Sequence, residues 1–86
     1  MNLNEKEDVI NKVCCNIMRR VTQSVNDSMP ILPNSSGKFE LNVVLDAALL
    51  ENSKAMGPYK VTESDNQEVI EAIRRDLTTF LKMVNK

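Results

Sequence analysis

The hydrophobic positions of this chain fall into three stretches, each with the three- or four-residue spacing of an amphipathic helix. The first stretch predicts a helix from about Asn4 to Asn26, with Asn4 as a candidate N-cap. Acidic residues follow Asn4, where they complement the positive end of the helix dipole. One apolar stripe runs along this helix and consists of Ile10, Val13, Cys14, Ile17, Val21 and Val25.

The second stretch, from Lys38 to Met56, is apolar on two sides. At about 100° per residue, one broad arc carries Leu41, Val44, Leu45, Ala48 and Leu49. The opposite side carries Val43, Ala47 and Leu50, and a narrow polar arc holds Asn42, Asp46 and Ser53. Gly57 and Pro58 are expected to end the helix, with the glycine suited to a left-handed cap. A helix with two apolar sides needs two partners, and the protein's own core supplies only one of them.

The third stretch gives the clearest helix. Its start lies within Thr62–Gln67, where several caps overlap and Ser64 and Gln67 have the spacing of a capping box. Apolar residues then recur at alternating steps of three and four, which is typical of a short coiled-coil seam. The seam consists of Ile70, Ile73, Leu77, Phe80 and Val84, and it is flanked by Val69 and Leu81.

The sequence therefore predicts one small helical domain over residues 1–86. The predicted fold is an all-α, three-helix antiparallel bundle with a long proline-containing connection between the first two helices. Within that connection Pro30-Ile31-Leu32-Pro33 is expected to be extended, because a residue that precedes proline avoids the helical region. The alternative is an α+β fold with a short hairpin around residues 39–45 and 58–62, where apolar and polar residues alternate.

Composition and charge exclude several classes of function. The 86 residues carry a net charge of −1, so bulk electrostatics disfavour a nucleic-acid partner. The longest nearly apolar run, Val43 to Leu50, is too short to span a membrane. The polar and acidic first residues do not fit a secretory signal. We expect a cytoplasmic protein with no membrane span.

The chain also lacks the residues that most chemistry requires. It contains no histidine and two cysteines, which are the adjacent residues Cys14 and Cys15 and cannot assemble a zinc site. No carboxylate pair or nucleophile motif indicates acid–base or covalent catalysis. We expect no metal, no cofactor, no catalytic residue and no enzymatic activity.

Two arginine pairs and the second apolar side of the middle helix suggest a binding role instead. Arg19 and Arg20 have no carboxylate three or four residues away, whereas Glu71 can pair with Arg74 or Arg75. Ile31 and Leu32 are expected either to cover the core or to dock into a partner. The predicted partner-binding residues are Arg19, Arg20, Ile31, Leu32, Val43, Ala47, Leu50 and Arg74.

These features favour a small cytosolic regulator that binds another protein, of an adaptor or inhibitor type such as bacteria and their viruses encode. A homodimer is the default expectation, because two-fold dimers are the commonest symmetric assemblies. One alternative is a nucleic-acid-associated regulator that uses the arginine pairs. A second alternative is a binder of a small phosphate-bearing ligand, held between subunits by Arg20, Arg74 and Tyr59.

Overall fold

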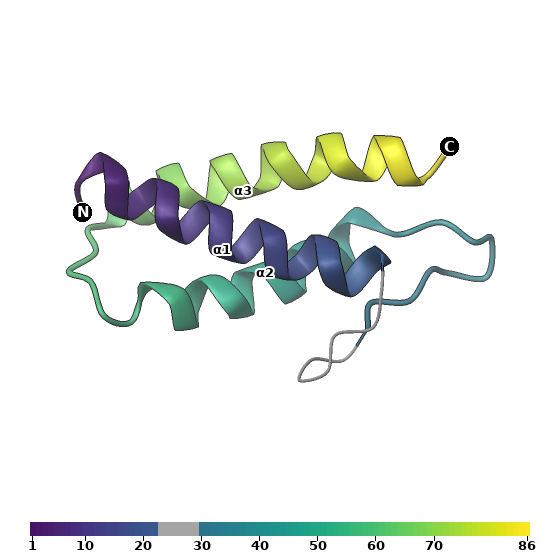
Figure 1. The fold of residues 1–86 in the computed structure, drawn as a ribbon, viewed down its shortest axis with the longest axis horizontal. Helices are drawn as coiled ribbons and strands as arrows, with labels where there is room; N and C mark the ends of the chain where they lie inside the picture. Colours follow the sequence, from purple (N-terminus) through teal and green to yellow (C-terminus); the bar gives the residue numbers. More distant parts are fainter. Residues whose placement is uncertain (23–29) are drawn as a thin grey trace.

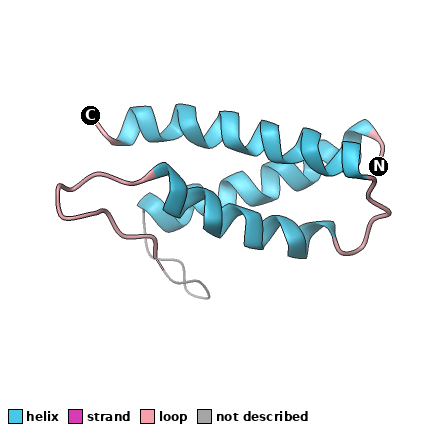
Figure 2. Ribbon diagram, turned by 180° about the vertical axis from the view of Figure 1, so that it is seen from behind, coloured by secondary structure: helices cyan, strands magenta, loops and turns pink. Residues whose placement is uncertain are grey.

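The computed structural model describes residues 1–22 and 30–86, and within these residues it consists of three α-helices. The helices are α1 (Leu3–Thr22), α2 (Leu41–Met56) and α3 (Glu63–Val84). Consecutive helices run in opposite directions, so α1 and α3 point the same way and α2 runs against both (Figure 1). Each helix contacts the other two, and the described residues contain no strand (Figure 2). The predicted three-helix bundle is confirmed, and the hairpin alternative is wrong.

Helix α1 packs into the core through a stripe close to the predicted one. Its buried residues are Val9, Val13, Cys14, Ile17 and Val21. The stripe begins with Val9, whereas Ile10 is half-buried at its margin. The predicted continuation of the helix to Asn26, and Val25 with it, falls on residues 23–29, which lie outside the described residues.

Helix α3 uses a different stripe from the predicted seam. The apolar residues that it buries are Val69, Ile73, Leu77 and Leu81, which recur every four residues. Ile70 and Phe80 are only half-buried, and Val84 is exposed. Val9, Val13, Ile17 and Val21 of α1 also recur every four residues. Rows with this spacing pack as ridges into grooves at an oblique angle, whereas a coiled-coil seam needs an average spacing of about 3.5 residues.

The start of α3 is fixed by contacts with the start of α1. The backbone N–H of Asp65 donates to Thr62 Oγ1 at 3.1 Å, and the N–H of Thr62 donates to Asp65 Oδ2 at 3.3 Å. The capping box therefore joins Thr62 to Asp65, and the predicted Ser64–Gln67 box is wrong. Asp65 also pairs with the Met1 amino group at 3.0 Å and with Lys6 Nζ at 3.2 Å. The hydrogen bonds from the Met1 amino group, from Thr62 N–H and from Lys6 lower the pKa of Asp65.

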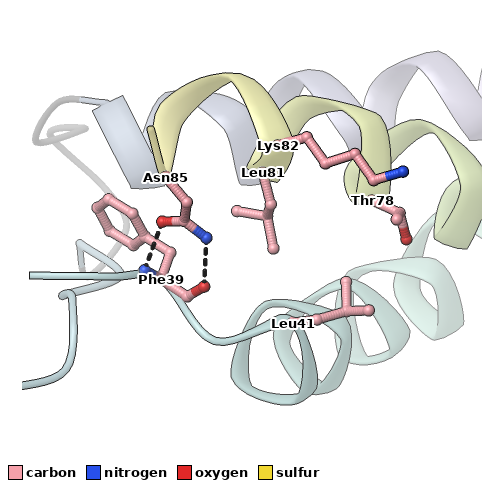
Figure 3. Close-up of a pocket in the computed structure, with 6 residues that line it drawn as sticks. All are labelled: Phe39, Leu41, Thr78, Leu81, Lys82 and Asn85. Carbon is pink, nitrogen blue, oxygen red and sulfur yellow. Dashed lines mark hydrogen bonds between the residues drawn. The ribbon is translucent and has the colours of Figure 1, made fainter. Parts of the chain in front are cut away.

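Helix α2 begins at Leu41 and not at Lys38 as the sequence predicted. The side-chain amide of Asn85, just beyond α3, forms two hydrogen bonds with the backbone of Phe39 (Figure 3). Phe39 N–H donates to Asn85 Oδ1 at 2.8 Å, and Asn85 Nδ2 donates to Phe39 O at 2.8 Å. Glu40 follows with extended backbone angles and serves as the N-cap. The Asn85 clamp thus holds this segment outside the helix.

Helix α2 ends where the sequence predicted, at Met56 before Gly57 and Pro58. Gly57 has a φ of −51°, so it does not take the left-handed conformation expected of a glycine cap. Its N–H instead donates to Lys54 O at 3.3 Å. The buried residues of this helix are Val44, Ala48, Asn52 and Met56.

The connection between α1 and α2 returns to the core at Ile31. The backbone N–H of Ile31 donates to Arg20 O at 2.8 Å, and its side chain is buried with the core residues. Ile31 therefore covers the core, and it is not on the surface where a partner would meet it. Leu32 is 72% exposed and remains on that surface.

Candidate functional site

One side of α2 presents apolar side chains to solvent. Val43, Ala47, Leu50 and Lys54 lie along this side at steps of four, three and four residues, and we call them the outer face of α2. Val43 is 49% exposed and Leu50 is 64% exposed. Ala47 is half-buried and packs against the core, so it forms the inner edge of the face. The predicted second apolar side therefore consists mainly of Val43 and Leu50.

Leu49 was predicted to belong to the core arc of α2, and this prediction is wrong. Its side chain is 40% exposed, although the sequence placed it with the core residues. At about 100° per residue, Leu49 lies far round the helix from Ala48, which is completely buried. Leu49 therefore lies at the margin of the core on the side away from the outer face.

Helix α1 borders the outer face of α2 with positive charge. Glu51 Oε1 lies 3.9 Å from both Arg20 Nη1 and Lys54 Nζ. Arg20, which has no carboxylate partner on its own helix, thus pairs with a carboxylate of α2. The Arg20 side chain is only 16% exposed, so Arg20 is mainly part of the contact between α1 and α2.

Arg19 is more accessible than Arg20. Lys12, Asn16 and Arg19 follow one another at steps of four and three residues, so they share one side of α1. Lys12 and Asn16 line a groove of about 320 Å³ toward Glu51 and Lys54 of α2. Among the ion pairs within residues 1–22 and 30–86, none involves Arg19, whose side chain is exposed. Arg19 therefore presents its charge to solvent on the side of α1 that also carries Lys12 and Asn16.

The other border of the outer face is polar and carries one acid. Asn42, Asp46 and Ser53 are all exposed, as the sequence predicted. In the part of the chain that the structure describes, Asp46 forms no ion pair. The outer face is thus flanked by a cation on the α1 side and by a carboxylate on the other side.

Arg74 belongs to a different surface from Arg19 and Arg20. It is exposed on α3, and its carbonyl oxygen accepts a hydrogen bond from Thr78 Oγ1 at 2.7 Å. The predicted pairing with Glu71 does not form within the described residues, and Arg75 instead contacts Asp76 at 3.4 Å. The structure therefore does not bring the sequence-predicted set together on one surface. Arg20 lies at the contact of α1 with α2, and Val43 and Leu50 are exposed on the outer face, with Ala47 at its inner edge. Arg19 is exposed on α1, Arg74 on α3 and Leu32 in the connection, and Ile31 is buried.

The structure does not assemble the predicted phosphate site within one chain. Arg20 lies in the last turn of α1, whereas Tyr59 follows α2 in the connection at the opposite end of the bundle (Figure 1). Arg74 lies on α3 between these two ends. Four grooves on the described residues, between α2 and α3, between α1 and α2, and on two parts of the α1/α3 surface, are lined by none of these three residues.

A groove between α2 and α3 was not foreseen from the sequence. It has a volume of about 410 Å³ and is lined by Phe39, Leu41, Thr78, Leu81, Lys82 and Asn85 (Figure 3). We call it the α2/α3 groove. Its shape depends on the Asn85 clamp, which joins residues 46 positions apart in the sequence. No local pattern predicts such a contact, although Arg74, Thr78 and Lys82 do recur at four-residue steps.

The described residues contain no group of side chains arranged to bind a metal ion. Cys14 is buried, and this burial, with Asp76 nearby, raises the pKa of its thiol to about 11. A thiol with so high a pKa is a poor nucleophile at neutral pH. In the same residues no helix combines the length and hydrophobicity that crossing a membrane requires.

Comparison of the chain with protein-family models, with curated protein sequences and with solved structures finds no match.

Proposed function

We propose that this chain is a small, non-enzymatic cytosolic regulator that acts through protein–protein contact, and that a second copy of the chain packs on the outer face of α2. The observation that carries this proposal is the exposure of Val43 and Leu50 on a helix whose other side is fully packed. Exposed aliphatic side chains in a row at coiled-coil spacing favour a helix as the occupant. A two-fold dimer is the simplest assembly that covers such a face on both copies.

The charges beside the face support one arrangement of the two copies. Asp46 lies on one border of the face, and α1, which carries the exposed Arg19 in its last turn, flanks the other border. Neither Arg19 nor Asp46 has an ion-pair partner within the described residues. A two-fold axis parallel to α2 places each border of one copy against the opposite border of the other. Arg19 then faces Asp46 of the second copy, whereas an antiparallel pairing brings the two Asp46 carboxylates together.

Light scattering coupled to size exclusion, over a range of protein concentrations, tests the self-association. We expect a dimer that Leu50→Asp converts to a monomer with an unchanged helical spectrum, because the new charge lies in the apolar contact. Asn11→Asp, at an exposed position of α1, is the matched control and is expected to leave the dimer intact. A monomer at every concentration contradicts the proposed dimer.

A charge exchange tests the arrangement. Arg19→Asp and Asp46→Arg are each expected to weaken the dimer, because each places like charges together. The double variant is expected to restore it, because the ion pair forms again with its signs reversed. If the two effects simply add, then Arg19 and Asp46 do not face one another.

A further inference from the structure

The α2/α3 groove combines an apolar floor with a cationic border. Phe39, Leu41 and Leu81 supply the apolar surface, and Lys82 extends along the upper edge above Thr78 (Figure 3). None of the 6 residues that line the groove is acidic. The groove is thus suited to a ligand that is both apolar and negatively charged.

Three cations that form no ion pair within the described residues lie on or near this groove. Arg74, Thr78 and Lys82 recur every four residues, so they lie along one side of α3. Lys38 approaches the far end of the groove, where its Nζ donates to Asn85 O at 2.6 Å. Of the ion pairs that the described residues form, none includes Arg74, Lys82 or Lys38. The charges of this surface are therefore not used to hold the bundle together.

At the other end of the bundle, by contrast, a lysine charge is used to join two helices. There Lys6 contacts Asp65 at 3.2 Å and Glu68 at 2.8 Å, so that its charge joins α1 to α3. Hydrogen bonds to Glu68 and Asp65 raise the pKa of Lys6. Arg74 and Lys82 have no such role in the fold, which leaves them available to a partner.

We propose that the α2/α3 groove binds an acidic amphipathic α-helix of another protein. Aliphatic side chains of that helix fill the space over Leu41 and Leu81, and its carboxylates pair with Lys82 and Arg74. Apolar anchors in a groove supply the affinity, and the charge pairs at the border select an acidic partner and set its orientation.

The backbone around the groove favours a helix over an extended peptide. A peptide strand would have to pair with the extended segment at Phe39, the nearest irregular backbone. Both the N–H and the C=O of Phe39 are already bonded to the Asn85 amide. A partner must therefore be held by side chains, and a helix presents aliphatic and acidic side chains on adjoining sides.

The openness of the groove favours a protein segment over a small molecule. Small ligands are usually bound in concave sites that bury most of their surface. The α2/α3 groove lies between residues at the start of α2 and residues at the end of α3 (Figure 3), and Lys82 at its edge is exposed. A helix laid along it gains contacts over several turns without being enclosed.

This site is separate from the outer face of α2 that we propose for dimer formation. The exposed residues Asn42, Asp46 and Ser53 lie between the two surfaces on α2. The inference extends the proposed binding role and does not require the dimer. The Leu50→Asp variant is therefore expected to retain the binding of the acidic helix, so the two proposals fail independently.

Titration of the ¹⁵N-labelled full chain with a synthetic helical peptide tests the proposal by NMR. The probe is a peptide of about 14 residues with leucine at helical spacing and glutamate on both sides of the leucine row. We expect amide shifts confined to Phe39, Leu41 and the second half of α3 with Asn85, from Arg74 to Asn85. Lys82→Glu is expected to weaken binding about tenfold, while Lys60→Glu, an exposed lysine of the α2–α3 connection, leaves it unchanged.

A twin peptide with lysine in place of every glutamate is the control for charge, and it is expected not to bind. Absence of shifts up to millimolar peptide, equal binding of the twin, or equal effects of Lys82→Glu and Lys60→Glu would overturn the proposal. Tighter binding of a single-stranded oligonucleotide or of an anionic detergent by the same residues would also overturn it. Helical spectra of each variant establish that the fold is intact.

Discussion

Val43 and Val44 are consecutive valines in the first turn of α2, and the structure gives them opposite environments. Val44 is completely buried, whereas Val43 is 49% exposed on the outer face. Residue type and helix position are the same, so only the direction of the side chain differs. This pair shows that one hydrophobic side of α2 is packed into the core while another remains partly exposed to solvent.

The difference has a practical consequence for experiments. A substitution on the buried side changes folding and association together, because an unfolded chain has no surface to offer. A substitution on the outer face is expected to leave the fold intact and to change only the proposed association. Matched variants on the two sides of α2 therefore separate stability from binding.

The largest effect is expected for Val44→Asp. A carboxylate at this completely buried position loses its hydration, and such burial costs more than about 4 kcal/mol. A domain of this size has a stability of only about 5–15 kcal/mol, so we expect loss of the cooperative melt in far-ultraviolet circular dichroism. Val43→Asp is the control and is expected to melt like the wild type. Equal melts for the two variants would show that the two sides of α2 are not distinct.

A smaller loss is expected for Asn85→Ala, which removes the amide that clamps Phe39. Two hydrogen bonds are lost, and we expect the free energy of unfolding to fall by about 1–3 kcal/mol in urea denaturation. This variant tests whether the clamp fixes the start of α2 and with it the direction of Val43 and Val44. Asn11→Ala, at an exposed asparagine of α1, is expected to cost less than about 0.5 kcal/mol. Equal stabilities of the two variants would show that the clamp is not needed.

The sequence predicted the helices well because their apolar spacing and their stop signals are local. Gly57-Pro58 ended α2 at the predicted residue, and the stripe of α1 was nearly correct. The start of α2 was misplaced because Asn85 acts on Phe39 from 46 positions away. The stripe of α3 was misjudged because the choice between a four-residue row and a heptad seam depends on the helix against which it packs.

The candidate site was predicted only in part for the same reason. The exposure of Val43 and Leu50 could be predicted, because helical periodicity alone places them on a different side of α2 from Val44 and Ala48. Ala47 was assigned to the second apolar side but packs against the core. For Ile31 the sequence left open whether it covers the core or docks into a partner, and only the packing of the connection decides that it covers the core. Arg20 has no carboxylate three or four residues away in the sequence. In the structure it meets Glu51 of α2, which no pattern within α1 can reveal.

The buried side of α2 is not wholly apolar, because it includes Asn52. Its side chain is buried, and its Oδ1 is one of two buried side-chain oxygens in the described residues that have no hydrogen-bond partner. Asn52→Leu keeps the branching of the side chain and removes the unpaired amide, so we expect stability to rise by about 1 kcal/mol in urea denaturation. Asn42→Leu, on the exposed arc, is expected to change stability by less than about 0.5 kcal/mol. A loss of stability for Asn52→Leu would mean that the buried side needs its amide.

The smallest change in stability is expected for Val43→Thr, which nearly preserves the shape of the side chain and adds one hydroxyl. The hydroxyl is hydrated at this exposed position, so we expect the free energy of unfolding of the monomer to stay within about 0.5 kcal/mol of the wild-type value. The same change reduces the apolar area that the proposed dimer buries. We therefore expect a several-fold rise in the dissociation constant of the dimer, measured by light scattering. Val44→Thr is the matched control. It buries a hydroxyl among apolar side chains, and we expect the free energy of unfolding to fall by about 1–3 kcal/mol. If Val43→Thr instead destabilised the chain as much as Val44→Thr, the outer face of α2 would be part of the core, and its exposed valine would not be available to a second copy.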